Sequence, residues 1–242
     1  TSFYFFLRFF TLGPNNFSQL KTSIIENSLI FTDTTGRIVT ALKITWIYFA
    51  KMIWPTNLCS NYSYNQIPIE HNFFNIGTIL GLFLIITSII FIFLYLKRKP
   101  IISFGLSIFL FSFLPISNLF FTTGTNMGER LFFFPSLGFC LIFGYLIYQI
   151  YNIKNEILKI IISIIISIIV IIYSFISFQA QNVWQNEEKL FLKAVQCSPD
   201  SVLSRSNAGA IYLINGDLEK AEKELKLAMD IKPIYSKGIN NL

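Results

Sequence analysis

The residues best suited to chemistry lie in one stretch, Leu114–Ile142, with the sequence LPISNLFFTTGTNMGERLFFFPSLGFCLI. Adjacent Glu129 and Arg130 place a carboxylate and a guanidinium between two apolar segments. An ion pair beside a membrane costs desolvation and is therefore a candidate functional site. The planar fork of an arginine also suits a phosphate group. The substrate-binding residues predicted from this stretch are Glu129, Arg130, Asn126 and Asn118.

Both charged residues also have simpler interpretations. Asn126, followed three residues later by Glu129, resembles a capping box at the start of a helix, where a carboxylate is favoured. Arg130 equally suits contact with lipid phosphates. Pro135 removes the usual hydrogen bond to the carbonyl of Leu131 and predicts a kink, which is more often a packing feature than a functional one. The sequence alone leaves these alternatives open.

A second polar stretch, Trp54–His71, is rich in tyrosine and amide side chains. Tyr62, Tyr64 and Asn65 supply stacking faces and amide groups that suit a sugar, although tyrosines near a membrane surface also form the common aromatic belt. His71 is the only histidine. It has no cysteine or aspartate neighbour at ligand spacing, so no metal site is predicted.

Other kinds of site find little support in the sequence. It contains no Gly-rich phosphate loop, nucleophile elbow or paired Ser/His/Asp set. The net charge is +6, but the basic residues are scattered and no basic face interleaves with aromatic residues, which argues against nucleic-acid binding. The three cysteines, Cys59, Cys140 and Cys197, show neither metal-ligand nor paired spacing and indicate little about the redox compartment.

The elements that would position these residues are apolar helices. Hydrophobic residues make up 53% of the chain and charged residues 13%, with a mean hydropathy of +0.58; a soluble domain has about 25% charged residues. The apolar residues fall in blocks of about 20, the length that an α-helix needs to cross a bilayer. The sequence therefore predicts an all-α polytopic transmembrane helix bundle, with spans at about 38–54, 73–96, 101–121, 131–151 and 157–178.

Charge placement predicts the orientation of these spans. The basic cluster at 97–99 and, two crossings later, Lys154 and Lys159 mark the cytoplasmic side. Segments 55–72 and 122–130, and everything after Phe178, then lie outside. The first predicted span carries Lys43 and Lys51, so it either crosses or lies in the interface with its lysines snorkelling.

From Gln179 the sequence changes character, with frequent charges and helical apolar spacing. Phe191, Ala194 and Pro199 recur as Leu225, Ala228 and Pro233, each at an offset of 34 residues, which is the period of the tetratricopeptide repeat (TPR). The predicted division is a membrane domain at 1–178 and the start of a TPR α-solenoid at 179–242.

Both ends of the chain suggest continuation. The opening TSFYFFLRFF resembles the exit of an earlier spanning helix. Ile239 and Leu242 would begin the first helix of a further repeat. A single repeat does not bury its own apolar face, so at least three repeats are expected in the parent protein.

Several motifs resemble one known family. The string NLFFTTGTNMGERLFFFPSLGFCLI, which begins at Asn118, resembles a signature of the transmembrane and TPR-containing O-mannosyltransferases. Phe5–Arg8 resembles the helix exit of that family, Tyr62–Asn65 an external segment of its microbial relatives, and Trp184–Pro199 the entry into its repeats. Asn61 departs from the pattern, since this position is often acidic.

The resemblance implies a multi-pass GT-C glycosyltransferase. Such an enzyme transfers a sugar, mannose in the animal members, from a dolichyl- or polyprenyl-phosphate donor to Ser or Thr of proteins, while TPRs on the lumenal or extracytoplasmic side bind acceptor or partner proteins. The lipid-linked sugar is then the only implied cofactor. Arg130 would stabilise the departing lipid phosphate, and the general base is expected upstream of Thr1.

The implied location is the endoplasmic reticulum membrane in a eukaryote or the plasma membrane in a bacterium. Two other functions remain compatible with the sequence. One is a non-catalytic, membrane-anchored TPR scaffold. The other is a ligase or polymerase of bacterial envelope polysaccharides.

Overall fold

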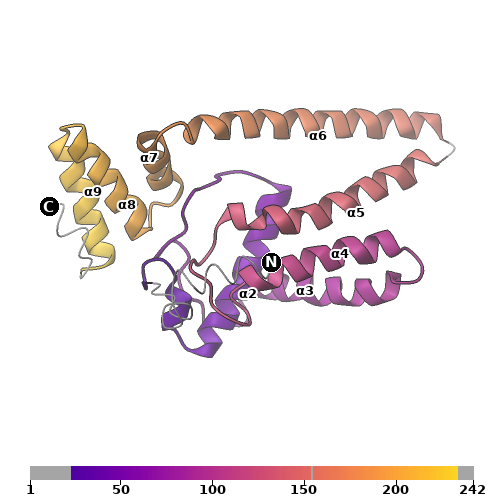
Figure 1. The fold of residues 1–242 in the computed structure, drawn as a ribbon, viewed down its shortest axis with the longest axis horizontal. Helices are drawn as coiled ribbons and strands as arrows, with labels where there is room; N and C mark the ends of the chain where they lie inside the picture. Colours follow the sequence, from indigo (N-terminus) through magenta and orange to yellow (C-terminus); the bar gives the residue numbers. More distant parts are fainter. Residues whose placement is uncertain (1–22, 154, 234–242) are drawn as a thin grey trace, which may run out of the picture.

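A computed structural model describes residues 23–153 and 155–233. All regular secondary structure in these ranges is helical, which confirms the predicted all-α class. The expectations for Phe5–Arg8, Lys154, Ile239 and Leu242 lie outside the described residues. Three helices, α3 (Ile76–Tyr95), α4 (Pro100–Phe113) and α5 (Phe133–Tyr151), run side by side, whereas the repeat helices lie at the other end of the long helix α6 (Figure 1).

Glycines allow the apolar helices to pack closely. A Cβ atom on Gly138 of α5 would lie 2.2 Å from the carbonyl oxygen of Gly105 on α4. A Cβ on Gly81 of α3 would lie 1.9 Å from the carbonyl oxygen of Leu42 on α2 (Thr34–Ile53). Because no side chain fits at these points, the backbones of the paired helices are in direct contact.

Three helices of the described ranges are long and apolar enough to cross a membrane: Ile76–Tyr95, Glu129–Tyr151 and Glu156–Val183. The predicted span 101–121 is shorter than expected. Helix α4 ends at Phe113 and a 3-10 turn, η2 (Leu114–Ile116), follows it, because Pro115 lacks the N–H that would continue the helix. The 14 residues of α4 rise about 21 Å, so a crossing by this segment stays a prediction.

Helix α2 covers the predicted segment 38–54 and is partly buried in protein. Its two lysines contact protein groups. Lys43 Nζ lies 3.4 Å from a Glu70 oxygen, and Lys51 Nζ lies 3.5 Å from a Glu129 oxygen. Both cations therefore have partners without snorkelling to lipid headgroups. Whether α2 crosses the membrane or lies along it stays a prediction.

Helix α6 (Glu156–Val183) stands apart from the other apolar helices (Figure 1), and none of its residues is buried. One polar contact joins it to α2, where the hydroxyl of Tyr173 donates to the carbonyl of Ile53. The change in composition at Gln179 falls inside the last turns of this helix. The proposed domain division at 178/179 therefore lies within an unbroken helix and stays a prediction.

The repeat region contains α7 (Glu187–Cys197) followed by the antiparallel pair α8 (Val202–Ile214) and α9 (Leu218–Ile231). Gly216 has a φ of +79° in the turn between the pair, a conformation that glycine adopts without strain. The side chain of Leu225 fills the space beside Gly209, where a Cβ would lie 2.7 Å from Leu225 Cγ. These contacts confirm a TPR-type helical pair.

An aromatic core joins α2 to the segment before α5. Tyr48 stacks on Phe132 with ring centroids 5.0 Å apart and meets Phe113 edge to face. The Tyr48 hydroxyl accepts a hydrogen bond of 2.8 Å from the N–H of Gly128. This core fixes the backbone immediately before Glu129 and so positions the candidate site.

Candidate functional site

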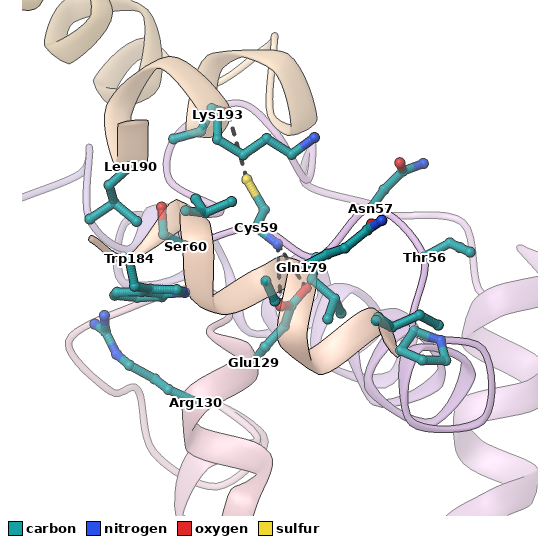
Figure 2. Close-up of a pocket in the computed structure, with 16 residues that line it drawn as sticks. Thr56, Asn57, Cys59, Ser60, Glu129, Arg130, Gln179, Trp184, Leu190 and Lys193 are labelled. Carbon is teal, nitrogen blue, oxygen red and sulfur yellow. Dashed lines mark hydrogen bonds between the residues drawn. The ribbon is translucent and has the colours of Figure 1, made fainter. Parts of the chain in front are cut away.

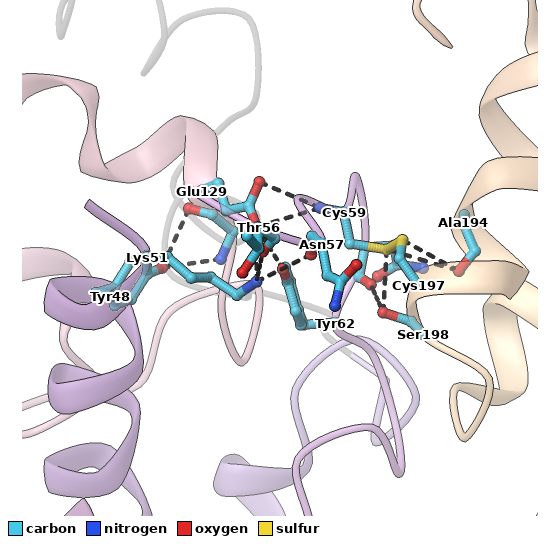
Figure 3. Close-up of polar contacts among 12 residues, drawn as sticks. Tyr48, Lys51, Thr56, Asn57, Cys59, Tyr62, Glu129, Ala194, Cys197 and Ser198 are labelled. Atoms are coloured by element: carbon cyan, nitrogen blue, oxygen red, sulfur yellow. Dashed lines mark hydrogen bonds and ion pairs between the residues drawn. A yellow bond between two sulfur atoms is a disulfide. The ribbon is translucent and has the colours of Figure 1, made fainter. Parts of the chain in front are cut away.

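The Glu129 carboxylate lies at the start of a 3-10 turn, η3 (Glu129–Phe132), and contacts the segment that follows α2. It accepts hydrogen bonds from the N–H of Cys59, with N–O distances of 3.2 Å, and from the hydroxyl of Tyr62. Figure 3 shows Lys51 reaching toward the same carboxylate from the end of α2. The side chains of Lys51 and Glu129 are 20% and 22% exposed, so the ion pair is largely desolvated.

These contacts replace the capping box that the sequence suggested. The cap of η3 is Gly128 and makes no side-chain hydrogen bond. Asn126 accepts from Ser28 instead of from the start of η3. The spacing of Asn126 and Glu129 fits a capping box, but contacts from distant parts of the chain engage both side chains.

The side chain of Lys51 contacts three parts of the site: the Glu129 carboxylate, the turn at Thr56 and Asn57, and the Tyr62 ring. Besides its contact with Glu129, its ammonium group donates to the carbonyls of Thr56 and Asn57 at 3.2 and 2.9 Å. It also lies 5.5 Å from the centre of the Tyr62 ring. A cation at the end of α2 is also favoured by the helix dipole. Lys51 therefore orders the turn that leads to Cys59, a role that the sequence did not reveal.

The environment of Tyr62 keeps its hydroxyl protonated. Burial raises the pKa of the phenol above its ordinary value, and the hydrogen bond to the Glu129 carboxylate raises the pKa further. The phenol is therefore a permanent donor to Glu129 at physiological pH. Both Glu129 oxygens are already engaged, so the arrangement suits positioning of the loop better than proton abstraction.

Asn118 and Asn126 are buried inside the segment that connects α4 to η3. Asn118 has a φ of +59°, and its amide donates to the carbonyls of Thr125 and Asn126 while its oxygen accepts from Asn27 and Thr123. Asn126 is 1% exposed, and its amide nitrogen has no partner among the described residues. This geometry gives both side chains a loop-stabilising role, and their predicted contact with substrate stays a prediction.

Tyr64 and Asn65 lie against the repeats and away from Glu129. The carbonyl of Tyr64 accepts a hydrogen bond of 2.7 Å from the N–H of Val202, and the N–H of Asn65 donates to the carbonyl of Asp200. The ammonium group of Lys232 lies 4.6 Å from the centre of the Tyr64 ring. Of Tyr62, Tyr64 and Asn65, the structure brings only Tyr62 into contact with Glu129 and Lys51.

A disulfide between Cys59 and Cys197 connects the same segment to the end of α7 (Figure 3). The two residues are 138 positions apart, so no local spacing could indicate the pairing. The spacing of the cysteines indicated no particular pairing, whereas the structure joins Cys59 to Cys197 and leaves Cys140 free. Disulfides of this kind persist in oxidising compartments.

A cavity of about 550 Å³ opens beside the disulfide and the neighbouring residues Glu129 and Arg130. We call it the larger cavity, to distinguish it from a smaller one described below. Its walls come from the segment after α2, the last turns of α6, and Leu190, Lys193 and Ala194 of α7 (Figure 2). The side chains of Ile176, Ala180, Val183 and Leu190 make part of it apolar. Its cationic members are Arg130 and Lys193, both exposed.

Arg130 is a charged side chain of the site that is available for binding. Within residues 23–153 and 155–233 it makes no ion pair or side-chain hydrogen bond, and it extends toward Trp184 (Figure 2). It also lines a second, smaller cavity of about 310 Å³ on the side of α8. A guanidinium that has no partner among the described residues and lies at the junction of two cavities suits an anion such as a phosphate.

Comparison with known proteins identifies relatives and a repeat. A tetratricopeptide repeat model matches residues 190–223. Protein O-mannosyl-transferase TMTC1 of Homo sapiens is 23% identical over 203 residues, covering 81% of this chain and 22% of the relative. A protein O-mannosyl-transferase of Caenorhabditis elegans is 26% identical over 232 residues, covering 94% of this chain and 32% of the relative.

A third relative, protein O-mannosyl-transferase Tmtc2 of Drosophila melanogaster, is 30% identical over 137 residues, covering 57% of this chain and 14% of the relative. The chain thus spans between about a seventh and a third of the length of these three relatives. No solved structure matches the chain.

Proposed function

Since this chain is a relative of the transmembrane and TPR-containing protein O-mannosyl-transferases, we propose that it forms part of a membrane protein O-glycosyltransferase. The donor is a dolichyl- or polyprenyl-phosphate sugar, and the acceptors are Ser or Thr hydroxyls of proteins outside the cytoplasm. The TPR helices bind acceptor or partner proteins.

The larger cavity carries this proposal. Its α6 wall is mainly apolar, and Arg130 of η3 and Lys193 of α7 add two cations to its lining. An amphiphile with an alkyl chain and an anionic headgroup matches both surfaces at once. A lipid-linked phosphate has this chemistry, whereas a soluble nucleotide donor would leave the apolar wall unused.

The length of α6 supports a position for this cavity at the membrane surface. A helix of 28 residues rises about 42 Å, and a hydrocarbon core of about 30 Å needs only about 20 residues. If the first residues of α6 lie at one surface of the membrane, the last turns of the helix project beyond the hydrocarbon at the other surface. These turns contribute Ile176, Gln179, Ala180 and Val183 to the cavity.

The chemistry that follows is a displacement at the anomeric carbon of the sugar. The acceptor oxygen forms the new bond as the bond to the lipid phosphate breaks, and negative charge develops on that phosphate. Arg130 would stabilise this charge. Because both oxygens of Glu129 are already engaged, we assign it a positioning role and assign no general base within the described residues.

The disulfide supports an external position for the repeats. Cys59 follows α2 and Cys197 ends α7, and charge placement predicts that both segments face away from the cytoplasm. A structural disulfide fits the lumen of the endoplasmic reticulum in a eukaryote or the bacterial periplasm.

The orientation is tested with cysteine labelling in a Cys140→Ser background. Asn215→Cys in the exposed TPR turn should react with a membrane-impermeant maleimide added from the external side of sealed vesicles. Arg98→Cys, in the predicted cytoplasmic connector, is the matched control and should react only after permeabilisation. The reverse pattern contradicts the proposed orientation.

The donor site is tested by sugar transfer from a polyprenyl-phosphate sugar to an acceptor peptide, with the full-length protein in nanodiscs. Arg130→Ala should reduce transfer at limiting donor by roughly tenfold or more, the effect of losing a charged hydrogen bond of about 1.5–3 kcal/mol. Arg130→Lys should retain part of the activity, because lysine keeps the charge but loses the bidentate fork.

Lys226→Ala, on the exposed side of α9, is the control and should transfer normally. Full transfer by Arg130→Ala would remove Arg130 from the donor site. A wild-type protein that is inactive under conditions supporting related transferases would favour the non-catalytic scaffold instead.

A further inference from the structure

The smaller cavity lies between the membrane-proximal loops and the first repeat helices. The segment Ser60–Ser63, the segment Gly124–Arg130, and helices α7 and α8 all contribute to its walls. Its volume of about 310 Å³ lies at the lower end of the range for small-molecule sites, roughly 300–1,000 Å³. The volume of the cavity is therefore closer to that of a single sugar ring than to that of a peptide segment.

Several polar side chains on this cavity have no hydrogen-bond partner within the part of the chain that the structure describes. The side chains of Ser60, Asn61 and Asn207 line it and make no hydrogen bond with other groups in the described part of the chain. Hydroxyl and amide groups both donate and accept hydrogen bonds. Three such groups around one small space suit a polyol, since each of its hydroxyls also donates and accepts.

Trp184 adds an apolar face to this polar set. It follows α6, is 57% exposed, and lines both cavities. An indole offers a large flat surface with one polar edge. A sugar ring carries C–H groups on one face and hydroxyls around its rim, so the indole and the surrounding amides complement different parts of the same ring.

The two cavities have lining residues in common, so ligands in the two cavities would lie next to each other. Arg130, Trp184 and Leu190 line both. In a glycosyl phosphate the sugar is bonded directly to a phosphate oxygen. A phosphate at Arg130 with its lipid directed toward α6 therefore places the sugar within reach of the smaller cavity.

We propose that the smaller cavity is a hexose-binding site whose far wall is formed by the repeat helices α7 and α8, with Asn61 and Asn207 as hydrogen-bonding residues and Trp184 as the stacking surface. The position of the hexose relative to Arg130 rests on the function proposed above. The TPR region then contributes to sugar recognition as well as to protein binding. The hexose comes either from the lipid donor or from a sugar already attached to the acceptor.

The test measures binding to the full-length protein in nanodiscs. The ligands are a polyprenyl-phosphate hexose, the same polyprenyl phosphate without sugar, a Ser-containing peptide, and that peptide with one hexose. For each pair the ratio of dissociation constants gives the contribution of the hexose. Asn207→Leu should reduce that contribution by roughly fivefold, the loss of about one hydrogen bond of 1 kcal/mol, and Asn61→Ala should act in the same direction from a different element.

Gln196→Leu, an equivalent change on the exposed face of α7, is the control and should leave every ratio unchanged. Thermal unfolding of each variant shows whether it is folded, and the two asparagine variants test the site independently. Loss of the hexose contribution for the lipid pair supports a donor sugar, and loss for the peptide pair supports an acceptor sugar.

Unchanged ratios in both asparagine variants would overturn the hexose site. An equal loss for the plain and the hexosylated peptide, together with an unchanged ratio for the lipid pair, would also overturn it and would show that the cavity binds peptide backbone. Arg130→Ala separates the two proposals, because it should weaken both polyprenyl-phosphate ligands by the same factor. If Arg130→Ala has no effect, the donor-site proposal fails while the hexose ratios still report on the smaller cavity.

Discussion

The hydroxyl of Tyr62 donates a hydrogen bond to the carboxylate of Glu129 across 67 positions of sequence. This contact joins the segment after α2 to the start of η3. By holding Glu129 in place, it also fixes the backbone position from which the side chain of Arg130 extends. The geometry of the candidate donor site therefore depends on a pair of residues that need not touch a substrate.

Tyr62→Phe should destabilise the protein because it removes a donor from a carboxylate that is only 22% exposed. The expected loss is about 1–3 kcal/mol in the free energy of unfolding. Chemical or thermal unfolding of the full-length protein in detergent measures it. Tyr212→Phe in α8 removes a hydroxyl with no hydrogen bond among the described residues and should change stability by less than about 0.5 kcal/mol.

The same residue predicts a dependence of stability on alkaline pH. The pKa of Tyr62 is raised in the folded state, so above pH of about 10 the unfolded chain loses this proton while the folded chain keeps it. The contribution of Tyr62 to stability is complete below that pH and decreases as pH rises above it. Subtracting the profile of Tyr62→Phe from that of the wild type isolates the effect, and identical slopes above pH 10 contradict it.

The disulfide should stabilise the attachment of the repeats to the membrane domain. Cys59→Ser with Cys197→Ser should lower the free energy of unfolding by roughly 2–4 kcal/mol, since the bond closes a long loop. Mass spectrometry of non-reduced peptides should find the crosslinked pair in protein from an oxidising compartment. Cys140→Ser is the control for removal of a thiol, and finding Cys59 and Cys197 both free in the native protein would disprove the pairing.

The repeat register predicts a site without room for a larger side chain. Ala228 is fully buried on α9, so Ala228→Trp should destabilise the protein by roughly 1–3 kcal/mol through overpacking. Lys226→Trp introduces the same indole on the exposed side of α9 and should be close to neutral. Equal melting temperatures for Ala228→Trp and the wild type would indicate a different register.

Local patterns in the sequence were enough to predict the helical elements. A helix crosses a membrane because about 20 successive residues are apolar, and this property can be read within one segment, as in Ile76–Tyr95 and Glu156–Val183. The TPR helices follow from a 34-residue offset between similar residues. In the structure Leu225, a member of this pattern, packs beside Gly209 of the facing helix.

The candidate site depended on tertiary structure because its contacts join residues that are far apart in sequence. The hydrogen-bond donors to the Glu129 carboxylate are 67 and 70 positions away, and the donor to the side-chain oxygen of Asn126 is 98 positions away. Spacing alone made Asn126 and Glu129 look like a capping box, since a local pattern shows only which contacts are possible. Which contacts form is decided by the aromatic packing around Tyr48 and by the Cys59–Cys197 bond, and these bring together segments that no sequence window contains.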